Sequence, residues 1–155
     1  MSQERVIVTQ NRKARHDYSI VDTFEAGMVL VGSEVKSLRA KTANLQDAFV
    51  IIDRGEAFLL NAYIAPYSFA HEGGHAPDRR RKLLLNRREI EKIAAAIAEQ
   101  GVTAVPLSIY FLDGRAKIEV ALGKGRRAYD KRQALKEKDQ KREIQRSTGR
   151  STKNM

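Results

Sequence analysis

Residues 48–64, AFVIIDRGEAFLLNAYI, place two apolar runs on either side of a short polar turn. The runs Ala48–Ile52 and Glu56–Ile64 are rich in β-branched and aromatic residues, which favour strands. Between them lies Asp53-Arg54-Gly55, where the glycine can adopt a positive φ and close a three-residue hairpin loop. This stretch therefore predicts a β-hairpin.

A second hairpin is predicted at residues 106–122. Leu107–Leu112 and Ala116–Leu122 are apolar runs separated by the turn residues Asp113-Gly114. Pro106 is expected at the start or the edge of the first strand, because its nitrogen cannot donate a hydrogen bond to a neighbouring strand. Both hairpins indicate antiparallel pairing.

Two further strands are expected nearer the N-terminus. Apolar and polar residues alternate from Tyr18 to Phe24, and a second apolar run covers Met28–Val31. The segment Glu25-Ala26-Gly27 is expected to break the extended chain between them, since glycine weakens the interior of a strand.

Two segments predict helices. Asn86 and Glu89 match a capping box, and an apolar stripe follows until Gly101 ends the segment. The members of that stripe are Ile90, Ile93, Ala94 and Ile97. A shorter helix is expected over Glu34–Ala40. In this helix Val35 and Leu38 should point inward, and Lys36 and Arg39 outward.

Together these elements predict a small, mainly β domain. Five or six antiparallel strands with two or three short helices, in about 110 residues, fit a small β-barrel of the oligonucleotide-binding (OB) type. The pattern alone does not separate this barrel from other small barrels. We expect a basic N-terminal segment at residues 1–16, the barrel domain at 17–122 and a basic C-terminal tail at 123–155.

Positive charge is concentrated in that tail. Residues 123–155 contain twelve Lys and Arg against four Asp and Glu, which gives +8 of the formal net charge of +10. The preceding 122 residues hold seventeen basic and fifteen acidic side chains and are nearly balanced. A polycation attached to a near-neutral domain favours a polyanionic partner, and nucleic acid is the first candidate.

Within the tail, Asp130–Arg146 consists almost entirely of good helix formers, without glycine or proline. The segment has almost no apolar face, so packing against other elements cannot stabilise a helix there. We therefore expect the tail to be disordered alone and helical when it is bound to a partner.

The composition excludes several classes of protein. Without cysteine, the chain has no disulfides, thiolate zinc sites or cysteine nucleophiles, and the reducing cytoplasm is its expected location. No apolar segment approaches the roughly eighteen residues of a membrane span, so no membrane partner is expected. The histidines form no recognisable catalytic set. We expect neither enzymatic activity nor a cofactor.

The most tempting catalytic motif is His71-Glu72-Gly73-Gly74-His75, which satisfies the H-E-x-x-H pattern of zinc peptidases. That chemistry needs both imidazoles on one face of a helix. Two adjacent glycines oppose a helix by about 1 kcal/mol each, and Pro66 and Pro77 bracket the segment. We expect a mobile, solvent-exposed loop without a metal.

Three basic clusters lie at the margins of the expected strands. They are Arg12, Lys13 and Arg15; Arg79-Arg80-Arg81-Lys82; and Gly123-Lys124-Gly125-Arg126-Arg127. A single cluster could be no more than a solvated loop, but their shared position favours contacts to phosphate groups. The glycines beside Lys124 would let backbone amides approach phosphates as well.

Read together, several motifs of the chain resemble the family of SsrA-binding proteins, also called small protein B. Members of this family are bacterial partners of transfer-messenger RNA in ribosome rescue. The residues that carry the resemblance are Asn11–Tyr18 (NRKARHDY), Phe24–Gly27 (FEAG), Gly32–Arg39 (GSEVKSLR), Arg81–Asn86 (RKLLLN), Gly123–Gly125 (GKG) and Asp130–Arg132 (DKR). They cover nearly the whole chain.

The resemblance implies an OB-type barrel that docks on the tRNA-like domain of transfer-messenger RNA. It also implies that Asn11, Glu25 and Leu84 contribute to RNA binding. A carboxylate repels phosphate, but Glu25 could accept hydrogen bonds from base-edge N–H groups or from a ribose 2′-OH. The other expected RNA-binding residues are Arg12, Lys13, Arg15, Tyr18, Lys36, Lys82, Lys124, Arg126 and Arg127.

For the tail, the resemblance implies a role on the ribosome, at the decoding site and in the empty mRNA channel of the small subunit. A helix over Asp130–Arg146 would extend about 25 Å in that channel. The expected ribosome-binding residues are Tyr129, Asp130, Lys131, Arg132, Lys136, Lys138, Lys141 and Arg142. Some family members carry histidine where this chain has Tyr129. Elongation factor Tu and alanyl-tRNA synthetase would be partners only through the RNA.

An alternative function remains open on the sequence. The chain could be a generic single-stranded nucleic-acid binding protein with an OB fold and a basic tail. Such a protein would show little preference for a folded tRNA-like RNA over a random strand, and its affinity would fall steeply with salt.

Overall fold

The computed structural model describes residues 4–66, 75–99 and 101–125, and the fold there is mainly β, as predicted. The tail residues 126–155 and the segment 67–74 lie outside the described residues, and so do the predictions made for them. The strands are β1 (Arg5–Gln10), β2 (Tyr18–Met28), β3 (Ala43–Asn44), β4 (Phe49–Asp53), β5 (Glu56–Leu60), β6 (Tyr63–Ile64), β7 (Arg81–Leu84), β8 (Val102–Leu112) and β9 (Arg115–Gly125). The helices are α1 (Arg12–Asp17), α2 (Gly32–Arg39) and α3 (Arg87–Ala98).

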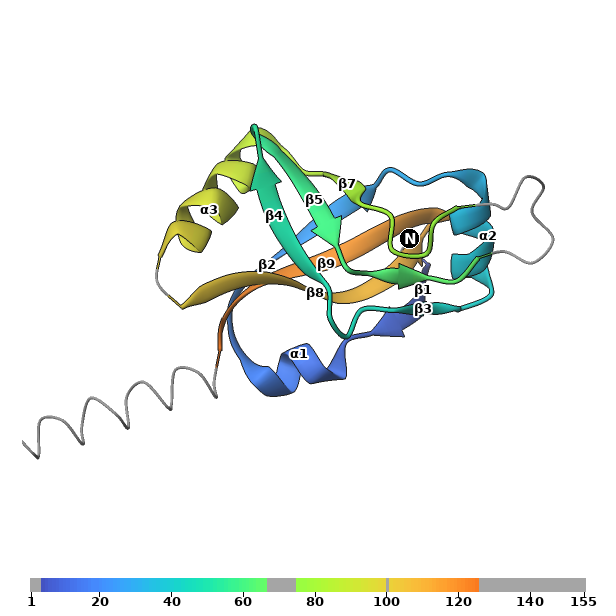
Figure 1. The fold of residues 1–155 in the computed structure, drawn as a ribbon, viewed down its shortest axis with the longest axis horizontal. Helices are drawn as coiled ribbons and strands as arrows, with labels where there is room; N and C mark the ends of the chain where they lie inside the picture. Colours follow the sequence, from blue (N-terminus) through green and yellow to red (C-terminus); the bar gives the residue numbers. More distant parts are fainter. Residues whose placement is uncertain (1–3, 67–74, 100, 126–155) are drawn as a thin grey trace, which may run out of the picture.

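Seven strands form one curled antiparallel sheet in the order β1-β8-β4-β5-β7-β2-β9 (Figure 1). Strand β9 also pairs with β8, so the pairings from β8 through β4, β5, β7, β2 and β9 return to β8 in a closed circuit. Strand β1 is added outside this circuit on β8, and β3 pairs with β6 in a separate small sheet. This closure agrees with the OB-type barrel that the sequence predicts.

The hairpin at residues 48–64 is confirmed, with a tighter turn than expected. Asp53 pairs with Glu56, so the loop contains two residues, Arg54 and Gly55, and the prediction of three is wrong. Their φ angles are +53° and +77°, as in the type I′ turns whose twist matches two-residue hairpins. The second strand ends at Leu60, because Asn61 adopts a φ of +59° and interrupts the extended chain.

The second hairpin is also confirmed, but its first strand begins earlier than predicted. Strand β8 has eleven residues and starts at Val102, so Pro106 lies inside it and not at its start or edge. The register with β9 shifts between Pro106 and Ser108. A β-bulge at this point accommodates a residue that has no N–H to donate.

The predicted break at Glu25-Ala26-Gly27 is wrong, because β2 continues through this segment to Met28. All three residues pair in register with β9, and the last of them, Gly27, pairs with Lys117. Strand β2 ends at Met28, and the segment Val29–Val31 is not a strand. The glycine is tolerated because both neighbouring strands hold the backbone extended.

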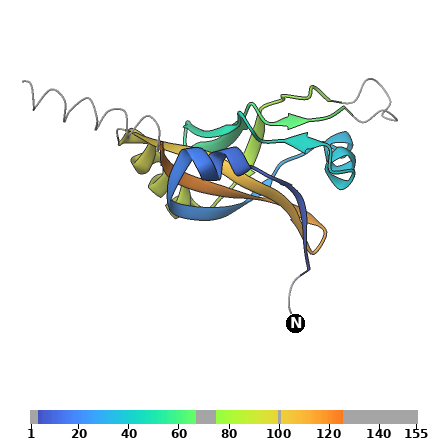
Figure 2. The same ribbon diagram turned by 90° about the horizontal axis from the view of Figure 1, so that it is seen from below.

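The helices cover different parts of the sheet. Helices α2 and α3 lie at opposite ends of the molecule, and α1 lies across one face of the sheet (Figures 1 and 2). Both predicted helices are confirmed. The capping box of Asn86 and Glu89 is formed at the start of α3, which packs Ile93 into the main core. In α2, Leu38 is buried while Lys36 and Arg39 are exposed.

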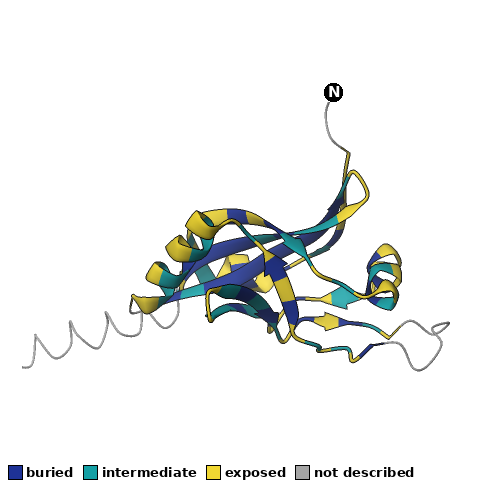
Figure 3. Ribbon diagram, turned by 90° about the horizontal axis from the view of Figure 1, so that it is seen from above, coloured by how far each residue is buried: buried dark blue, intermediate teal, exposed yellow. Residues whose placement is uncertain are grey.

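Two apolar clusters stabilise this arrangement. The main one fills the inside of the curled sheet, and the three long strands β2, β8 and β9 contribute nine of its twenty buried residues (Figure 3). The second lies on the outer face, where Ala14 of α1 packs against Val105, Leu107 and Ala121. Because β1 pairs with β8 and α1 packs on this cluster, residues 5–17 belong to the same folded unit as the barrel.

Candidate nucleic-acid interface

Two of the predicted RNA-binding residues, Glu25 and Leu84, lie together on the outer face of the sheet. Leu84 of β7 pairs directly with Gly27 of β2, and Glu25 precedes that glycine by two residues on the same face. Leu84 is 53% exposed, which is unusual for a leucine on a strand. A Cβ atom on Gly27 would lie 3.3 Å from the Leu84 Cβ, so glycine leaves room for this side chain.

A residue that the sequence analysis did not assign to the RNA-binding site forms a hydrogen bond with Glu25. Tyr110 of β8 donates its hydroxyl proton to Oε2 of Glu25. The Tyr110 side chain is buried, and the guanidinium of Arg5 lies 3.8 Å from the centre of its ring. Burial raises the pKa of Tyr110, and the hydrogen bond to Glu25 raises it further, so the phenol remains a donor at neutral pH.

A second carboxylate stands beside the first. Glu119 of β9 pairs with Glu25, and two like charges in this position repel each other. Arg15 of α1 donates to Oε1 of Glu119 over 3.2 Å and compensates part of this repulsion. The ion pair also connects the cations of α1 to the outer face. We call the surface formed by Arg15, Glu25, Gly27, Leu84 and Glu119 the outer-face patch.

Asn11 is not on this patch, although the resemblance implies a role for it in RNA binding. Its side chain is buried, and its Oδ1 accepts a hydrogen bond from the Ala14 nitrogen, which caps α1. Its Nδ2 donates to the carbonyl oxygens of Leu45 and Pro106, each at 2.9 Å. With both amide donors engaged inside the protein, Asn11 fixes the position of α1 on the sheet.

The three cations of α1 point outward from the anchored helix. Arg12, Lys13 and Arg15 are all exposed to the solvent. Lys13 forms a loose ion pair with Asp47, with 3.8 Å between Nζ and Oδ1. Such an exposed pair contributes little to stability.

Tyr18 and Lys124 lie near α1, at the point where β2 begins and β9 ends. Tyr18 is half-buried over Gly123, and a Cβ atom on that glycine would lie 2.8 Å from the Tyr18 Cβ. Gly123 is thus required by the packing of Tyr18. Gly123 is buried in β9, where it pairs with both β2 and β8. Its amide is therefore not available for a phosphate, although the sequence suggested that it would be. Lys124 is exposed, and Arg126 and Arg127 lie outside the described residues.

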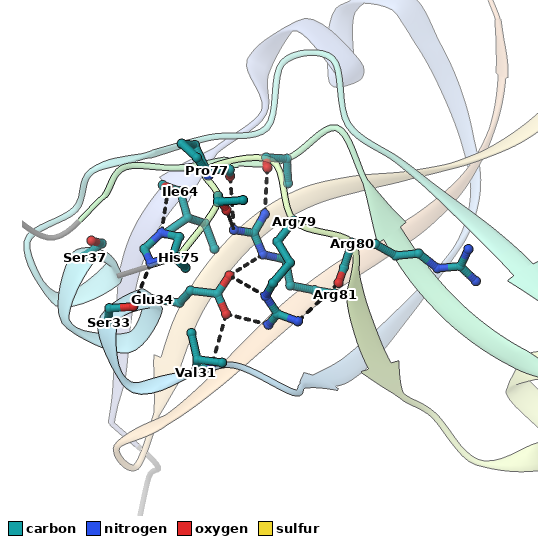
Figure 4. A network of polar contacts seen from close by, with 12 residues as sticks. Val31, Ser33, Glu34, Ser37, Ile64, His75, Pro77, Arg79, Arg80 and Arg81 are labelled. Carbon is teal, nitrogen blue, oxygen red and sulfur yellow. Dashed lines mark hydrogen bonds and ion pairs between the residues drawn. The ribbon is translucent and has the colours of Figure 1, made fainter. Parts of the chain in front are cut away.

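The basic cluster at residues 79–82 is mostly neutralised within the protein. Glu34 of α2 is fully buried and binds two of its members (Figure 4). Arg79 Nη2 lies 2.6 Å from Oε1 of Glu34, and Arg81 Nε lies 2.6 Å from Oε2. The other two members pair with acidic residues at the surface, Arg80 with Asp53 and Lys82 with Glu56.

Arg81 is as buried as its partner. Its remaining donors reach the carbonyl oxygens of Ala62 and Pro77, at 2.8 and 3.1 Å. Burial would raise the pKa of Glu34, but hydrogen bonds from Arg79, the Val31 N–H and Arg81 outweigh it, so the pKa lies below its usual value. Burial lowers the pKa of Arg81 despite its bond to Glu34. This pair anchors α2 to β7 and is not a surface for RNA.

His75 departs from the solvent-exposed loop predicted for residues 71–75. It is buried, with Nδ1 2.8 Å from the Ser33 hydroxyl and Nε2 2.9 Å from the Ile64 carbonyl oxygen (Figure 4). Both ring nitrogens are therefore engaged by the protein. His71 and Glu72 lie outside the described residues. Among the residues that are described, no group of three or more His, Cys, Asp or Glu is arranged to hold a metal ion.

The last predicted RNA-binding residue, Lys36, is exposed on α2, at the end of the molecule opposite α3 (Figure 1). The structure thus brings Arg15, Glu25 and Leu84 to the outer face of the sheet, and Lys82, two residues before Leu84 on β7, lies on the same face. Lys36 lies elsewhere. Tyr110 was missed because its contact with Glu25 joins residues 85 positions apart. Within 4–66, 75–99 and 101–125, no helix is long and apolar enough to cross a membrane.

Comparison with known proteins gives a consistent result. The SmpB protein family model matches residues 8–150. The SsrA-binding protein of Sulfurihydrogenibium sp. is 56% identical over 144 residues, which cover 93% of this chain and 94% of that protein. The SsrA-binding protein of Nocardioides sp. is 55% identical over 153 residues, which cover 99% and 96%.

A solved structure agrees with the fold. It is described as "tmRNA-SmpB: a journey to the center of the bacterial ribosome", and one of its chains superposes with a TM-score of 0.65. The two chains are 44% identical, and the match covers 76% of this chain and 82% of the other. The fold, the motifs and these relatives lead to one conclusion: the chain belongs to the SmpB protein family, whose curated members are SsrA-binding proteins.

Proposed function

We propose that the protein binds the tRNA-like domain of transfer-messenger RNA and promotes its entry into stalled ribosomes. The observation that carries this proposal is the outer-face patch, where Glu25 and Leu84 lie on one face of the sheet with Arg15 of α1. The names of the relatives and the description of the ribosome structure support the same partners. The protein makes and breaks no bond and needs no cofactor, and it acts in the cytoplasm, where ribosomes and transfer-messenger RNA meet.

The outer-face patch and helix α1 together offer the three kinds of contact that a structured RNA requires. Leu84 offers an exposed apolar surface on which a base can pack. Glu25 accepts hydrogen bonds from base-edge N–H groups or a ribose 2′-OH, which provides selectivity. The cations Arg12, Lys13 and Arg15 attract phosphate groups without regard to sequence. Asn11 contributes by holding α1 in place.

The tail has a separate task in this proposal. It enters the empty mRNA channel of the small subunit near the decoding site, folds there as a helix and uses its lysines and arginines against rRNA phosphates. Tyr129 at its beginning is suited to stack on a base. Elongation factor Tu and alanyl-tRNA synthetase are reached only through the bound RNA.

Two sets of variants test this division of labour. Glu25→Gln and Leu84→Ala in the full chain should weaken binding to the tRNA-like domain, whereas a chain ending before Asp130 should keep most of that binding and lose ribosome rescue. Glu91→Gln, an exposed carboxylate on α3, is the matched control and should change neither. If truncation and Glu25→Gln reduce RNA affinity equally, the division is wrong.

The generic single-stranded nucleic-acid binding protein is the competing function. A competition assay across a salt series separates the two, using the tRNA-like RNA and a random strand of equal length. Our proposal expects a preference for the folded RNA that persists as the salt concentration rises. A generic binder would show equal affinities that fall together.

A further inference from the structure

The hydrogen bond between Tyr110 and Glu25 crosses a whole strand. Tyr110 of β8 pairs with Lys117 of β9, and Glu25 of β2 pairs with Glu119, two residues further along β9. The phenol therefore reaches diagonally over β9 to the carboxylate on its far side. The two residues share no strand pairing, so this contact is made by the side chains alone.

The Tyr110 ring is held in place by its burial and by Arg5. Only 2% of the residue is exposed, and the Arg5 guanidinium covers the ring at 3.8 Å. A buried phenol needs a hydrogen-bond partner, and Glu25 supplies it. The exposed Glu25 carboxylate is thereby hydrogen-bonded to a buried side chain that has little freedom to move.

Without this bond, the surroundings would not hold Glu25 in one place. Its neighbour across the ladder is Glu119, a like charge, and the cation Arg15 is engaged with Glu119. Lys117 lies opposite Gly27, Arg5 lies over the Tyr110 ring, and Lys82 precedes Leu84 by two residues on the same face of β7. Repulsion from Glu119 and free rotation of an exposed glutamate would both spread the carboxylate over several rotamers.

We propose that Tyr110 is a positioning residue for RNA recognition, which holds the Glu25 carboxylate in the orientation that accepts hydrogen bonds from the RNA. This inference rests on the proposed function. The bond uses Oε2 of Glu25, and among the described residues no donor is recorded for Oε1. That oxygen is left for a base-edge N–H or a ribose 2′-OH, and its position is set before the RNA arrives. Arg5 acts one step further back, by fixing the ring.

A double-mutant cycle tests the proposal. The full chain is prepared as wild type, Tyr110→Phe, Glu25→Gln and the double variant, and the Kd of each is measured with the tRNA-like domain and with a random RNA of equal length. Tyr110→Phe removes only the hydroxyl and keeps the ring beneath Arg5. It should weaken binding to the tRNA-like domain by about three- to tenfold, the cost of ordering one flexible side chain on binding.

In the Glu25→Gln background, the same substitution should have a smaller effect than in the wild type, since the amide keeps one acceptor oxygen for Tyr110 but has lost the second carboxylate oxygen that faces the RNA. The dependence of affinity on salt should not change, because no phosphate contact is lost. Tyr63→Phe is the matched control. Tyr63 is exposed on β6, away from the outer-face patch, and losing its hydroxyl should leave both affinity and thermal stability unchanged.

The outcomes separate the two hypotheses. If Tyr110→Phe weakens binding equally in both backgrounds, Tyr110 does not act through Glu25. The same holds if the loss of affinity is no larger than the fraction of unfolded protein that the thermal unfolding curve shows. The positioning role is also wrong if Glu25→Gln weakens binding while Tyr110→Phe does not. If Glu25→Gln itself leaves the affinity unchanged, the outer-face patch is not the RNA-binding surface, and the proposed function loses its main observation.

Discussion

Glu34 is the residue on which the region between α2 and β7 depends. Its carboxylate is fully buried and accepts hydrogen bonds from Arg79, from Arg81 and from the Val31 nitrogen. Two guanidinium groups therefore rely on one anion. Removing one partner of a buried ion pair leaves the others desolvated and unpaired, which costs more than the pair itself contributes.

Glu34→Gln should therefore lower the free energy of unfolding by about 3–5 kcal/mol. The effect has a pH signature. Because the folded-state pKa of Glu34 lies below its usual value, the stabilisation is complete above the unfolded pKa of about 4.3 and is lost as the pH falls through the folded value. Urea unfolding between pH 2 and pH 7 should show this loss for the wild type.

The amide variant should show a smaller fall in stability over the same acidic range. Glu91→Gln, whose carboxylate forms an exposed i,i+4 pair with Arg87, serves as the control and should retain the wild-type pH profile. A Glu34→Gln protein with wild-type stability at pH 7 would contradict the role of the buried carboxylate.

Among the elements, α1 shows how a structural residue and its neighbours divide their roles. The helix has only six residues, too few to be stable alone. It is held by Asn11, whose side chain caps the helix and bonds to two carbonyl oxygens from distant segments. The exposed cations of the helix depend on that anchor for their position.

Asn11→Ala should lower the free energy of unfolding by about 1–3 kcal/mol, because it leaves buried carbonyl groups without a donor and removes the cap. It should weaken RNA binding as well. Arg12→Ala and Lys13→Ala should weaken RNA binding without a comparable loss of stability. Thermal unfolding and RNA titration of the three variants distinguish these roles. An Asn11→Ala variant with reduced affinity and unchanged stability would instead indicate direct contact with the RNA.

Strand β9 offers a second prediction at this scale. Gly123→Ala should destabilise the protein by about 1–3 kcal/mol, since the added Cβ would lie 2.8 Å from the Tyr18 Cβ in a packed layer. Gly32→Ala is the matched control. No atom lies within 4 Å of its added Cβ, and the position starts α2, where alanine is the better helix former. Denaturant unfolding should show a clear loss of stability for Gly123→Ala and a smaller loss or a gain for Gly32→Ala. Equal losses of stability in the two variants would contradict the packing argument.

The same elements show how far the sequence predicts this structure. Local signals were sufficient for both hairpins and for the capping box at Asn86, since each depends on residues close together in the chain. The break expected at Gly27 failed because pairing on both sides overrides the weak preference of one glycine. Contacts such as Glu34 with Arg81, 47 residues apart, arise only when the whole sheet has formed, and no local pattern indicates them.

At the scale of the whole molecule, charge is divided unevenly along the chain. Residues 123–155 carry +8 of the net +10, whereas the outer-face patch combines two carboxylates, one arginine and an exposed leucine. The selective contacts of the patch depend on shape and hydrogen bonds, whereas the attraction of the tail for RNA is weakened as salt screens its charges. The two contributions to RNA affinity are therefore separable by ionic strength.

Removing residues 126–155 should reduce the slope of log K against log salt by about 0.7 for each phosphate contact that the tail makes. The preference for the tRNA-like domain over a random RNA should remain. Filter binding at several salt concentrations, with the full chain and the shortened chain side by side, measures both quantities. Loss of the preference together with the slope would place selectivity in the tail and not in the barrel.

The closed circuit of strand pairings also governs when this protein can fold during its own synthesis. Strand β1 pairs only with β8, and β2 depends largely on β9, so the first strands to leave the ribosome wait for the last two. At a synthesis rate of about 5–20 residues per second, the interval between the end of β1 and the end of β9 is roughly 6–23 seconds. During that interval β4 and β5 can pair with each other, but the apolar residues of β2 are without their main partner β9. A nascent chain of this protein therefore exposes unpaired strand edges of β1 and β2 until β8 and β9 have been synthesised.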